Sequence, residues 1–466
     1  MSQLSRYTGI DLSDLNWYQA ANRGELNHQA ARFGLELAQL AYDFEVDQWL
    51  DAGWTDVSIQ VNSRLFSGVG AQDEEKDWLQ QAKNMVLPKL AQSLKSVANP
   101  ITEIRSLLNQ EQELETGKAI VLLKQDEEKR FTIAIGFMGT GKRVQDWAGN
   151  MRFMHEDHLH EGFTFIANQF IENEKDIHFP TAASALGLKD LTLDDVLFFC
   201  RMADSPFRLI LAGHSQGAAV LQVWTWKKRQ EGVLREYLNG FGYAAPVVAS
   251  QPVDTRATCP ITLFLAEEDV FTRVGLSHHI GTAWRLAADE AFRAACYGKY
   301  DKDSLFSAVL GLFNRISDTR TGFLFCLAYL ESLSDRPEKM VLESLSAFLE
   351  KPWAESFADL PMKTEEWADK LLRQGKLAFA GFYQDVEGRE PSDEEVGEMY
   401  ALINPVMDRF GAIAFSQMIV KALHLTHSLV NRETGLSDYA PYSYMVIRGF
   451  DDLTRVEEEK KPDAGA

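Results

Sequence analysis

The chain has 466 residues, of which 45% are hydrophobic and 11% aromatic, and its formal net charge is −21 at pH 7. This composition is ample for a sizeable core and argues against long-range disorder. The acidic balance excludes nucleic acid as an expected partner and disfavours purely electrostatic adsorption to an anionic membrane.

The start of the chain and its cysteines indicate a cytoplasmic protein. The opening segment, MSQLSRYTGIDLSDLNW, lacks the basic and apolar regions of a signal peptide, and no run of about 18 apolar residues occurs. A secretion route that needs no cleaved signal would leave no trace in these features. The cysteines are widely spaced without a metal-ligand pattern and are expected to be buried thiols; they are Cys200, Cys259, Cys296 and Cys326.

The first predicted elements are helices, followed by a β-hairpin. Apolar residues recur at helical spacing from 27 to 42, and a second helical region spans about 78–110. The period then changes, because two apolar, β-rich runs at 119–123 and 131–137 flank a charged turn. Two such runs around a polar turn predict an antiparallel hairpin.

The most informative motif is Gly213-His214-Ser215-Gln216-Gly217, which lies between an apolar β-rich run at 207–212 and a helical run at 218–230. The glycines permit a tight, strained turn that presents the serine hydroxyl at the sheet edge. The helix N-terminus then favours the negative charge that develops when the hydroxyl attacks a carbonyl. The pattern predicts Ser215 as a nucleophile; the alternative is a glycine-flanked serine in an ordinary loop.

A serine nucleophile needs a base that is held by an acid. When the serine lies in a turn between a strand and a helix, as here, the expected chain order is serine, acid, histidine. Strands are predicted at 237–244 and 261–266, and the second runs directly into Glu267-Glu268-Asp269. Its position after a strand predicts Asp269 as the acid, whereas Glu267 and Glu268 could simply be solvated charges. Strands that alternate with helices over this span predict an α/β fold with a mostly parallel sheet.

An oxyanion hole needs two donors. One is expected from the backbone N–H of Gln216, the residue after the nucleophile. The other is expected from the loop Gly136-Phe137-Met138-Gly139-Thr140, where Thr140 offers both its N–H and its hydroxyl. The alternative is that this glycine-rich stretch is only a turn.

A helical block follows the predicted acid and defines the domain organisation. From about 287 to 420 the pattern is almost wholly helical and predicts an insertion, or cap, over the sheet. Separate helices are expected at 305–316, 321–333, 337–349, 364–373 and 393–403, with a further helix that begins at Asn404-Pro405. β-character returns at 442–448. The predicted units are a core at 1–286, a cap at 287–420, a return to the core at 421–455 and a flexible tail at 456–466.

Over about residues 30–285 the sequence resembles the class 3 lipases, the fungal-type branch of the α/β hydrolases. The family motifs F-R-G-T, D-W, V-H-x-G-F, F-G-x-P-R-V and N-D-I-V-x-R-L correspond here to Phe137-Met138-Gly139-Thr140, Asp146-Trp147, Leu159-His160-Glu161-Gly162-Phe163, Phe241-Gly242 with Pro246-Val247, and Glu268-Asp269-Val270-Phe271-Thr272-Arg273-Val274. The resemblance implies an α/β-hydrolase fold, Thr140 and Gln216 as the oxyanion pair, and a lid-like helix at 142–151. Met138 departs from the family, because an arginine is usual there.

The resemblance also bears on the catalytic base. The family's histidine normally follows soon after the acid, but His279 here lies in a stretch similar to the family's H-x-G-x-x-W, where the histidine is not the base. The base is therefore expected beyond the helical block. His427 is preferred, because Thr426-His427-Ser428-Leu429 is most similar to the family's segment; His424 and His279 stay open as alternatives.

No metal or other cofactor is expected. His155, His158 and His160 lack the H-E-x-x-H spacing, and no further ligand is evident near them.

These features predict a serine carboxylic-ester hydrolase that forms an acyl-enzyme on Ser215, with Asp269 orienting His427. The resemblance implies a lipase that acts on lipid esters such as triacylglycerols, with transient contact to a lipid surface through the lid or cap. A short-chain esterase, a phospholipase and a thioesterase are alternatives on the same residues. A non-catalytic binding protein with an α/β-hydrolase fold is the alternative of another class, and a membrane-active toxin exported by a dedicated machine is a third. The sequence does not indicate an oligomeric state.

Overall fold

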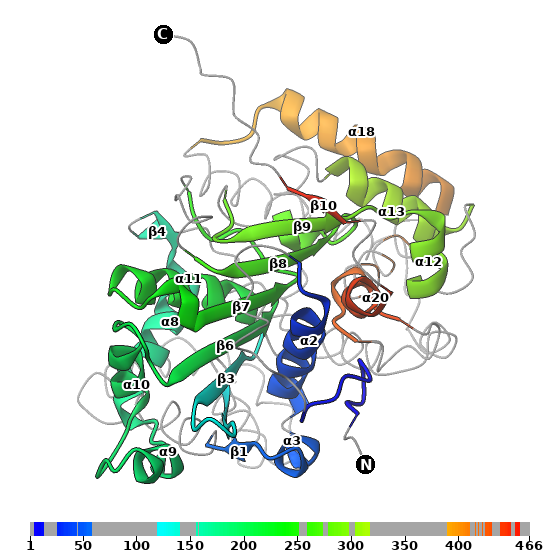
Figure 1. The fold of residues 1–466 in the computed structure, drawn as a ribbon. Coiled ribbons are helices and arrows are strands. Elements are labelled where there is room, and N and C mark those ends of the chain that lie inside the picture. Colours follow the sequence, from blue (N-terminus) through cyan, green and yellow to red (C-terminus); the bar gives the residue numbers. More distant parts are fainter. Residues whose placement is uncertain are drawn as a thin grey trace, which may run out of the picture.

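The computed structural model describes residues 4–13, 26–43, 45–57, 119–139, 155–156, 158–250, 259–273, 278–297, 303–316, 389–410, 415, 418, 422, 425–430, 439–448 and 453–456. Within this part of the chain the strands form an eight-stranded sheet and a separate two-stranded ribbon, β4 (His155–Glu156) with β5 (Leu159–His160). Helices cover both faces of the large sheet (Figure 1), which confirms the predicted α/β class.

The large sheet has the strand order β1-β2-β3-β6-β7-β8-β9-β10. Its strands are β1 (Thr55–Asp56), β2 (Ala119–Gln125), β3 (Phe131–Phe137), β6 (Phe207–His214), β7 (Leu238–Tyr243), β8 (Ile261–Ala266), β9 (Thr282–Leu286) and β10 (Leu453–Arg455). Neighbours are parallel from β3 to β9, and the remaining pairs are antiparallel. The predicted hairpin, the predicted strands around 237–266 and the mostly parallel sheet are therefore confirmed.

The core lies on both faces of this sheet. Ile120 and Ile210 belong to one apolar cluster, whereas their strand neighbours Val121 and Leu211 belong to a second. Successive side chains of a strand point to opposite faces, so a strand that is apolar throughout contributes to both. The covering helices are α2 (His28–Asp43) and α20 (Pro441–Arg448) on the first face, and α8 (Glu161–Glu172), α10 (Leu193–Phe199) and α11 (Gln216–Gln230) on the second.

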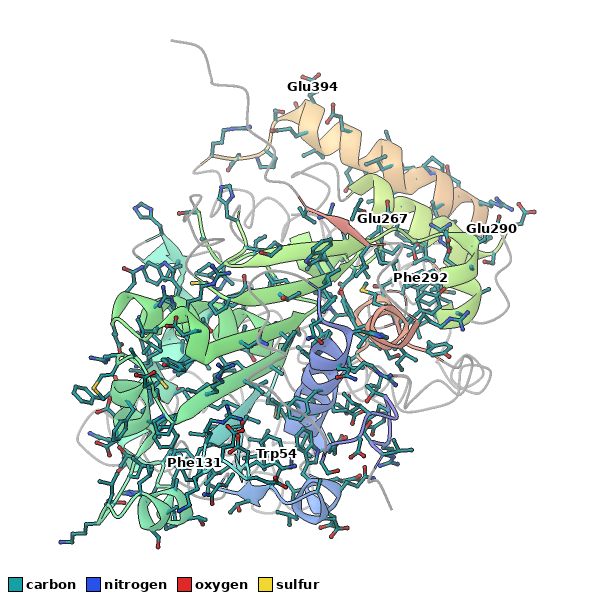
Figure 2. The ribbon with its side chains drawn as sticks, viewed as in Figure 1. Trp54, Phe131, Glu267, Glu290, Phe292 and Glu394 are labelled. Carbon is teal, nitrogen blue, oxygen red and sulfur yellow. The ribbon has the colours of Figure 1, made fainter. Side chains whose placement is uncertain are left out.

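Helix α2 confirms the helix predicted at 27–42 and is anchored by aromatic side chains. The ring of Phe33 lies 4.9 Å from that of Trp49 in α3 (Asp47–Asp51) and 5.6 Å from that of Trp54. Figure 2 shows Trp54 and Phe131 at the end of the sheet away from Glu267, which follows β8. Aromatic packing of this kind fixes α2 across the sheet.

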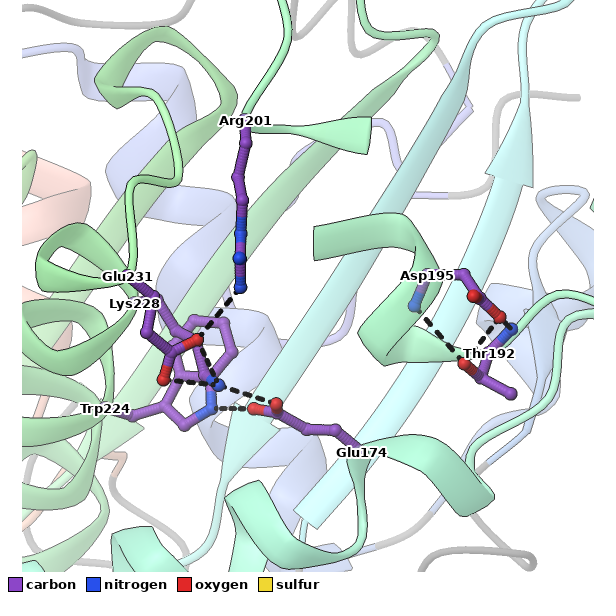
Figure 3. A network of polar contacts seen from close by, with 7 residues as sticks. All are labelled: Glu174, Thr192, Asp195, Arg201, Trp224, Lys228 and Glu231. Atoms are coloured by element: carbon purple, nitrogen blue, oxygen red, sulfur yellow. Dashed lines mark hydrogen bonds and ion pairs between the residues drawn. The ribbon is translucent and has the colours of Figure 1, made fainter. Parts of the chain in front are cut away.

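A buried ion pair fixes α11 on the second face (Figure 3). Lys228 Nζ lies 2.7 Å from Glu174 Oε2, and both side chains are at most 3% exposed. Trp224 Nε1 donates to the other Glu174 oxygen at 2.6 Å, and Glu231 also accepts from Lys228, at 3.1 Å. Burial of a charged pair is tolerated when its remaining donors and acceptors are satisfied, as they are here.

The C-terminal part of the chain corrects one prediction. Residues 442–448 form the helix α20 rather than a strand. Tyr442, Met445 and Val446 are buried at helical spacing, and Pro441 begins the helix, where a missing N–H costs nothing. The chain returns to the sheet one segment later, as β10, which pairs antiparallel with β9.

The described part of the helical block contains α12 (Glu290–Tyr297), α13 (Leu305–Ile316) and α18 (Asp393–Phe410). Helix α13 confirms the prediction at 305–316. The separate helix expected from Asn404-Pro405 is wrong, because α18 continues through Pro405. Ile403 and Val406 are buried in the first apolar cluster and α18 packs on α13, so packing outweighs the hydrogen bond that proline removes.

The helices predicted at 78–110, 321–333, 337–349 and 364–373 lie outside the described residues, and the cap boundaries at 287 and 420 stay a prediction. Among the described helices, none combines the length and the apolar character needed to cross a membrane.

Candidate active site

Ser215 occupies a strained turn between β6 and α11. Its backbone has φ 54° and ψ −124°, a conformation that residues with a side chain rarely adopt. The Ser215 N–H donates to the carbonyl of Tyr243 at 2.9 Å, which fixes the turn to the neighbouring strand. A β-carbon at Gly217 would lie 2.1 Å from the carbonyl oxygen of Phe137, so only glycine fits there. These are the features of a nucleophile elbow.

The expected oxyanion loop lies against this elbow as far as the structure describes it. The backbone of Phe137 and Met138 is packed on Gly217, and a β-carbon at Gly139 would lie 2.5 Å from the carbonyl oxygen of His214. Gln216 is the first residue of α11, and the N–H groups of a first helical turn point out of its N-terminus. Thr140 and the lid-like segment 142–151 lie outside the described residues.

The structure brings Asp269 and His427 together across 158 positions of sequence. The Nδ1 of His427 lies 2.9 Å from Oδ2 of Asp269, and the two side chains are 3% and 0% exposed. Asp269 follows β8, as the sequence predicted, and His427 comes from the segment between α18 and α20. The pairing leaves Nε2, the far nitrogen of the ring, as the atom for proton exchange with a nucleophile.

His427 also lies beside the elbow. The Nε2 of His214, the residue before Ser215, is 2.7 Å from the backbone carbonyl oxygen of His427. The two imidazole rings are 4.9 Å apart, and the ring of Phe271 packs on His427 at 4.6 Å. Asp269 and His427 therefore lie next to the turn that carries Ser215, at the carboxyl ends of β6 and β8, where parallel sheets place their sites.

Asp269 has further partners that sequence reasoning missed. Its Oδ1 accepts from the N–H of Phe271 at 3.0 Å, and its Oδ2 accepts from the hydroxyl of Tyr442. Tyr442 is fully buried, and its hydroxyl also accepts from the N–H of Ala266 at 3.4 Å. Because Tyr442 lies 173 positions after Asp269, no local pattern could have revealed this contact.

The two glutamates before Asp269 differ from each other. Glu268 is fully buried, and its Oε1 accepts from Nε of Arg293 at 2.7 Å, so its interpretation as a solvated charge is wrong. Burial raises the pKa of Glu268, while Arg293 opposes the shift. Glu267 is half-buried and accepts from the N–H of Ala288 at 2.8 Å. Neither glutamate takes the place of Asp269 against His427.

The other candidate histidines lie elsewhere or outside the described residues. His279 is packed against the backbone of Thr272 and Pro246, and burial lowers its pKa to about 4. His424 lies outside the described residues. The N-terminus of α8 is capped by His160, whose ring stacks on Phe163 at 4.1 Å.

The described residues contain no group of three or more His, Cys, Asp or Glu side chains that could hold a metal ion. The cysteines among them, Cys200, Cys259 and Cys296, are buried, as predicted, and Cys326 lies outside the described residues. Burial raises the pKa of Cys200 to about 12, so this thiol stays protonated and inert.

The chain matches no protein-family model and no curated protein. Solved structures of fungal lipases match parts of it. A Rhizomucor miehei lipase in a propeptide complex is 17% identical over 36% of this chain and 52% of its own, with a TM-score of 0.26. Lipase II from Rhizopus niveus is 16% identical over 37% and 62%, with a TM-score of 0.26. A lipase from Rhizopus microsporus var. chinensis is 17% identical over 38% and 58%, with a TM-score of 0.27. The chain thus spans less than two thirds of the length of these lipases.

Proposed function

We propose that this protein is a serine hydrolase that cleaves carboxylic esters through an acyl-enzyme on Ser215. The observation that carries the proposal is the buried pair of Asp269 and His427, at 2.9 Å, beside a strained serine turn at a helix N-terminus. A serine hydroxyl becomes a useful nucleophile only with an adjacent base that an acid orients. The three residues come from distant parts of the chain. If any one of them had a purely structural role, the fold would not need to bring the other two near it.

In the proposed reaction, Ser215 Oγ attacks the ester carbonyl while Nε2 of His427 accepts the hydroxyl proton. The Nδ1–H of His427 donates to Asp269, which stabilises the imidazolium that forms. The imidazolium then returns the proton to the leaving alcohol, and the acyl-enzyme remains. Water repeats the sequence in the second half-reaction and releases the carboxylic acid.

The charge on the former carbonyl oxygen needs donors that are in place before the reaction. The backbone N–H of Gln216 and the N–H and hydroxyl of Thr140 are the proposed donors. The backbone of Phe137 and Met138 packs on Gly217. This contact supports the proposal, because it sets the loop before Thr140 directly against the turn that carries Ser215 and Gln216.

Lipid esters, such as acylglycerols, are the proposed substrate class. The support is the ordered set of sequence motifs similar to class 3 lipases, which includes the lid-like segment at 142–151. The helical segment between Asp269 and His427 would set the acyl-chain range. Short-chain esters, phospholipids and thioesters are the other substrates that the same three residues could serve.

A p-nitrophenyl ester series of increasing acyl length, together with a fluorophosphonate probe, tests the proposal on the full chain. Wild type should be labelled on Ser215 and should hydrolyse at least one ester. Ser215→Ala, His427→Ala and Asp269→Asn should each lose about 10³-fold or more in kcat while they stay folded. His424→Ala and Glu267→Gln are the matched controls and should keep most of the activity.

Absence of labelling on folded wild type would contradict the proposal and favour a non-catalytic binding protein. Full activity in His427→Ala with loss in His424→Ala would keep the hydrolase but reassign its base. The chain length with the highest kcat/KM distinguishes a lipase from a short-chain esterase.

A further inference from the structure

A line of hydrogen bonds runs behind the elbow, from the oxyanion loop to the backbone of His427. The Tyr42 hydroxyl, at the end of α2, lies 2.8 Å from Nδ1 of His214. The Nε2 of His214 lies 2.7 Å from the carbonyl oxygen of His427. The backbone N–H of Gly139 donates to the same Tyr42 hydroxyl. Four segments that are far apart in sequence are thereby joined through two side chains.

The direction of these bonds follows from what each atom can do. The carbonyl of His427 can only accept, so Nε2 of His214 must carry a proton. In a neutral imidazole Nδ1 then has a lone pair, and the Tyr42 hydroxyl must donate to it. Burial raises the pKa of Tyr42, so the hydroxyl keeps the proton that it donates. The Tyr42 hydroxyl thus accepts from Gly139 and donates to His214, and no donor along the line faces another donor.

The packing around the line is tight. His214 is 7% exposed, and its ring lies 5.7 Å from that of Tyr42. A β-carbon at Gly139 would lie 2.0 Å from the Tyr42 hydroxyl, so the loop can approach only because this residue is glycine. A small shift of any one segment would therefore break a bond or create a clash.

We propose that Tyr42 and His214 are positioning residues, which hold the oxyanion loop, the nucleophile turn and the His427 segment in one arrangement. The inference rests on the proposed hydrolase function, because it assigns the two residues to that site. Neither residue need touch the substrate. Their effect comes from geometry, since a misplacement of about 1 Å in a catalytic group can cost on the order of 10²-fold in rate.

The first test removes the Tyr42 hydroxyl. Tyr42→Phe should lower kcat by about 10- to 100-fold with little change in KM, because the substrate contacts stay. Tyr237→Phe is the matched control, since its buried hydroxyl also accepts a backbone N–H, from Ser205 at 3.1 Å, away from the site. The two variants should lose similar amounts of Tm, but only Tyr42→Phe should lose kcat. Equal kcat in both variants would overturn the proposal.

The second test separates the two bonds of His214. His214→Gln can place an amide N–H near the position of Nε2, and it should keep part of the kcat by retaining the bond to the His427 carbonyl. His214→Asn can offer an oxygen only near the position of Nδ1, so the His427 bond is lost and kcat should fall further. The opposite order of the two variants would contradict a role through His427.

A spectroscopic readout separates this inference from the proposed function. The Nδ1–H proton of His427 can be followed by NMR in the full chain with ¹⁵N-labelled histidine. It should shift in Tyr42→Phe and stay unchanged in Tyr237→Phe. If wild type hydrolyses no ester while this shift is present, the proposed function fails and the positioning role stands. If the resonance is the same in both variants, the positioning role fails whatever the activity is.

Discussion

Asp269 has a defined orientation because three donors hold its carboxylate. The N–H of Phe271 occupies Oδ1, while His427 and Tyr442 share Oδ2. Hydrogen bonds to a charged group contribute more than neutral ones, and a fully buried carboxylate depends on them. We therefore expect Tyr442 to influence both stability and rate, although it is not one of the three proposed catalytic residues.

Tyr442→Phe should lower the free energy of unfolding by about 1.5–3 kcal/mol, because Asp269 loses a charge-assisted bond and Ala266 loses an acceptor. The kcat should fall about tenfold, since Asp269 then holds His427 in a less defined orientation. Urea unfolding and ester hydrolysis measure the two effects. Tyr444→Phe, on the same helix, is the control and should change neither quantity. A Tyr442→Phe variant with wild-type kcat would limit Tyr442 to a structural role.

At the scale of residues, some positions could be predicted from the sequence and others could not. The positions of Ser215 in a turn between a strand and a helix, and of Asp269 just after a strand, were predictable, because each depends on a local pattern. The burial of Glu268 was not, because its partner Arg293 comes from α12. A charged residue after a strand has the same sequence pattern whether it is solvated or paired.

At the scale of elements, the loop that follows β3 can contact α11 only because Gly217 has no side chain. A helical glycine is normally destabilising by about 1 kcal/mol relative to alanine. Here a β-carbon would meet the carbonyl oxygen of Phe137 at 2.1 Å, which is backbone and cannot rotate away. Replacement of a helical glycine by alanine normally stabilises a protein. At Gly217 the same replacement should therefore destabilise it.

Gly217→Ala should lose stability and at least about 10²-fold in kcat, because the loop that carries the proposed oxyanion donors must move. Gly397→Ala is the matched control, since Gly397 is an exposed residue in α18 with open space around the added β-carbon. It should gain about 0.5–1 kcal/mol and keep its activity. Thermal unfolding and ester hydrolysis of the two variants provide the comparison. A gain of stability in both would show that the loop can yield.

The Lys228–Glu174 pair fixes the other end of α11, thirteen residues or about 20 Å from Ser215. Lys228→Met should lower the unfolding free energy by about 3–5 kcal/mol, because Glu174 is left buried without its cation. The double variant Lys228→Met/Glu174→Gln should recover part of this loss, which a double-mutant cycle in urea measures. The rate of fluorophosphonate labelling should stay unchanged in the folded fraction. Additive losses in the double variant would mean that the two charges are not coupled.

Two elements show why local pattern alone misassigns structure. Residues 442–448 alternate well enough to predict a strand, but burial of Tyr442, Met445 and Val446 selects a helix. Asn404-Pro405 has the pattern of a helix start, but α18 continues through it while packed on α13. In both cases the partner surface, which the local sequence does not contain, decides the outcome.

At the scale of the whole molecule, the N-terminal segment is attached to α2 through one buried carboxyl group. Glu36 Oε1 accepts from the hydroxyl of Ser5 at 2.8 Å and from the N–H groups of Thr8 and Tyr7 at 2.7 and 3.1 Å. Burial raises the pKa of Glu36 from 4.5 to about 7, and the donors only partly offset this shift. Between about pH 4.5 and 7, Glu36 in the folded protein therefore keeps a proton that the unfolded chain has already released.

This difference predicts a pH dependence with a defined sign. The contribution of Glu36 to stability is fully present below about pH 4.5 and is lost as the pH rises through about 7. Glu36→Gln, which keeps the acceptor oxygen, should therefore gain Tm relative to wild type as the pH rises across this window. Thermal unfolding at several pH values measures the difference, with the exposed Glu236→Gln as the control. A constant difference between Glu36→Gln and wild type would contradict the raised pKa.

The sequence by itself determined the α/β class, the hairpin, the parallel strands and the elbow around Ser215. Each of these depends on periodicity and turn chemistry within about ten residues, which a local segment contains in full. Only the tertiary structure brought His427 to Asp269, Tyr442 to the same carboxylate, and Tyr42 to His214. These contacts join positions more than 150 residues apart. Their physical cause is the packing of α2, α20 and the His427 segment on one face and edge of the sheet, and no local pattern contains that packing.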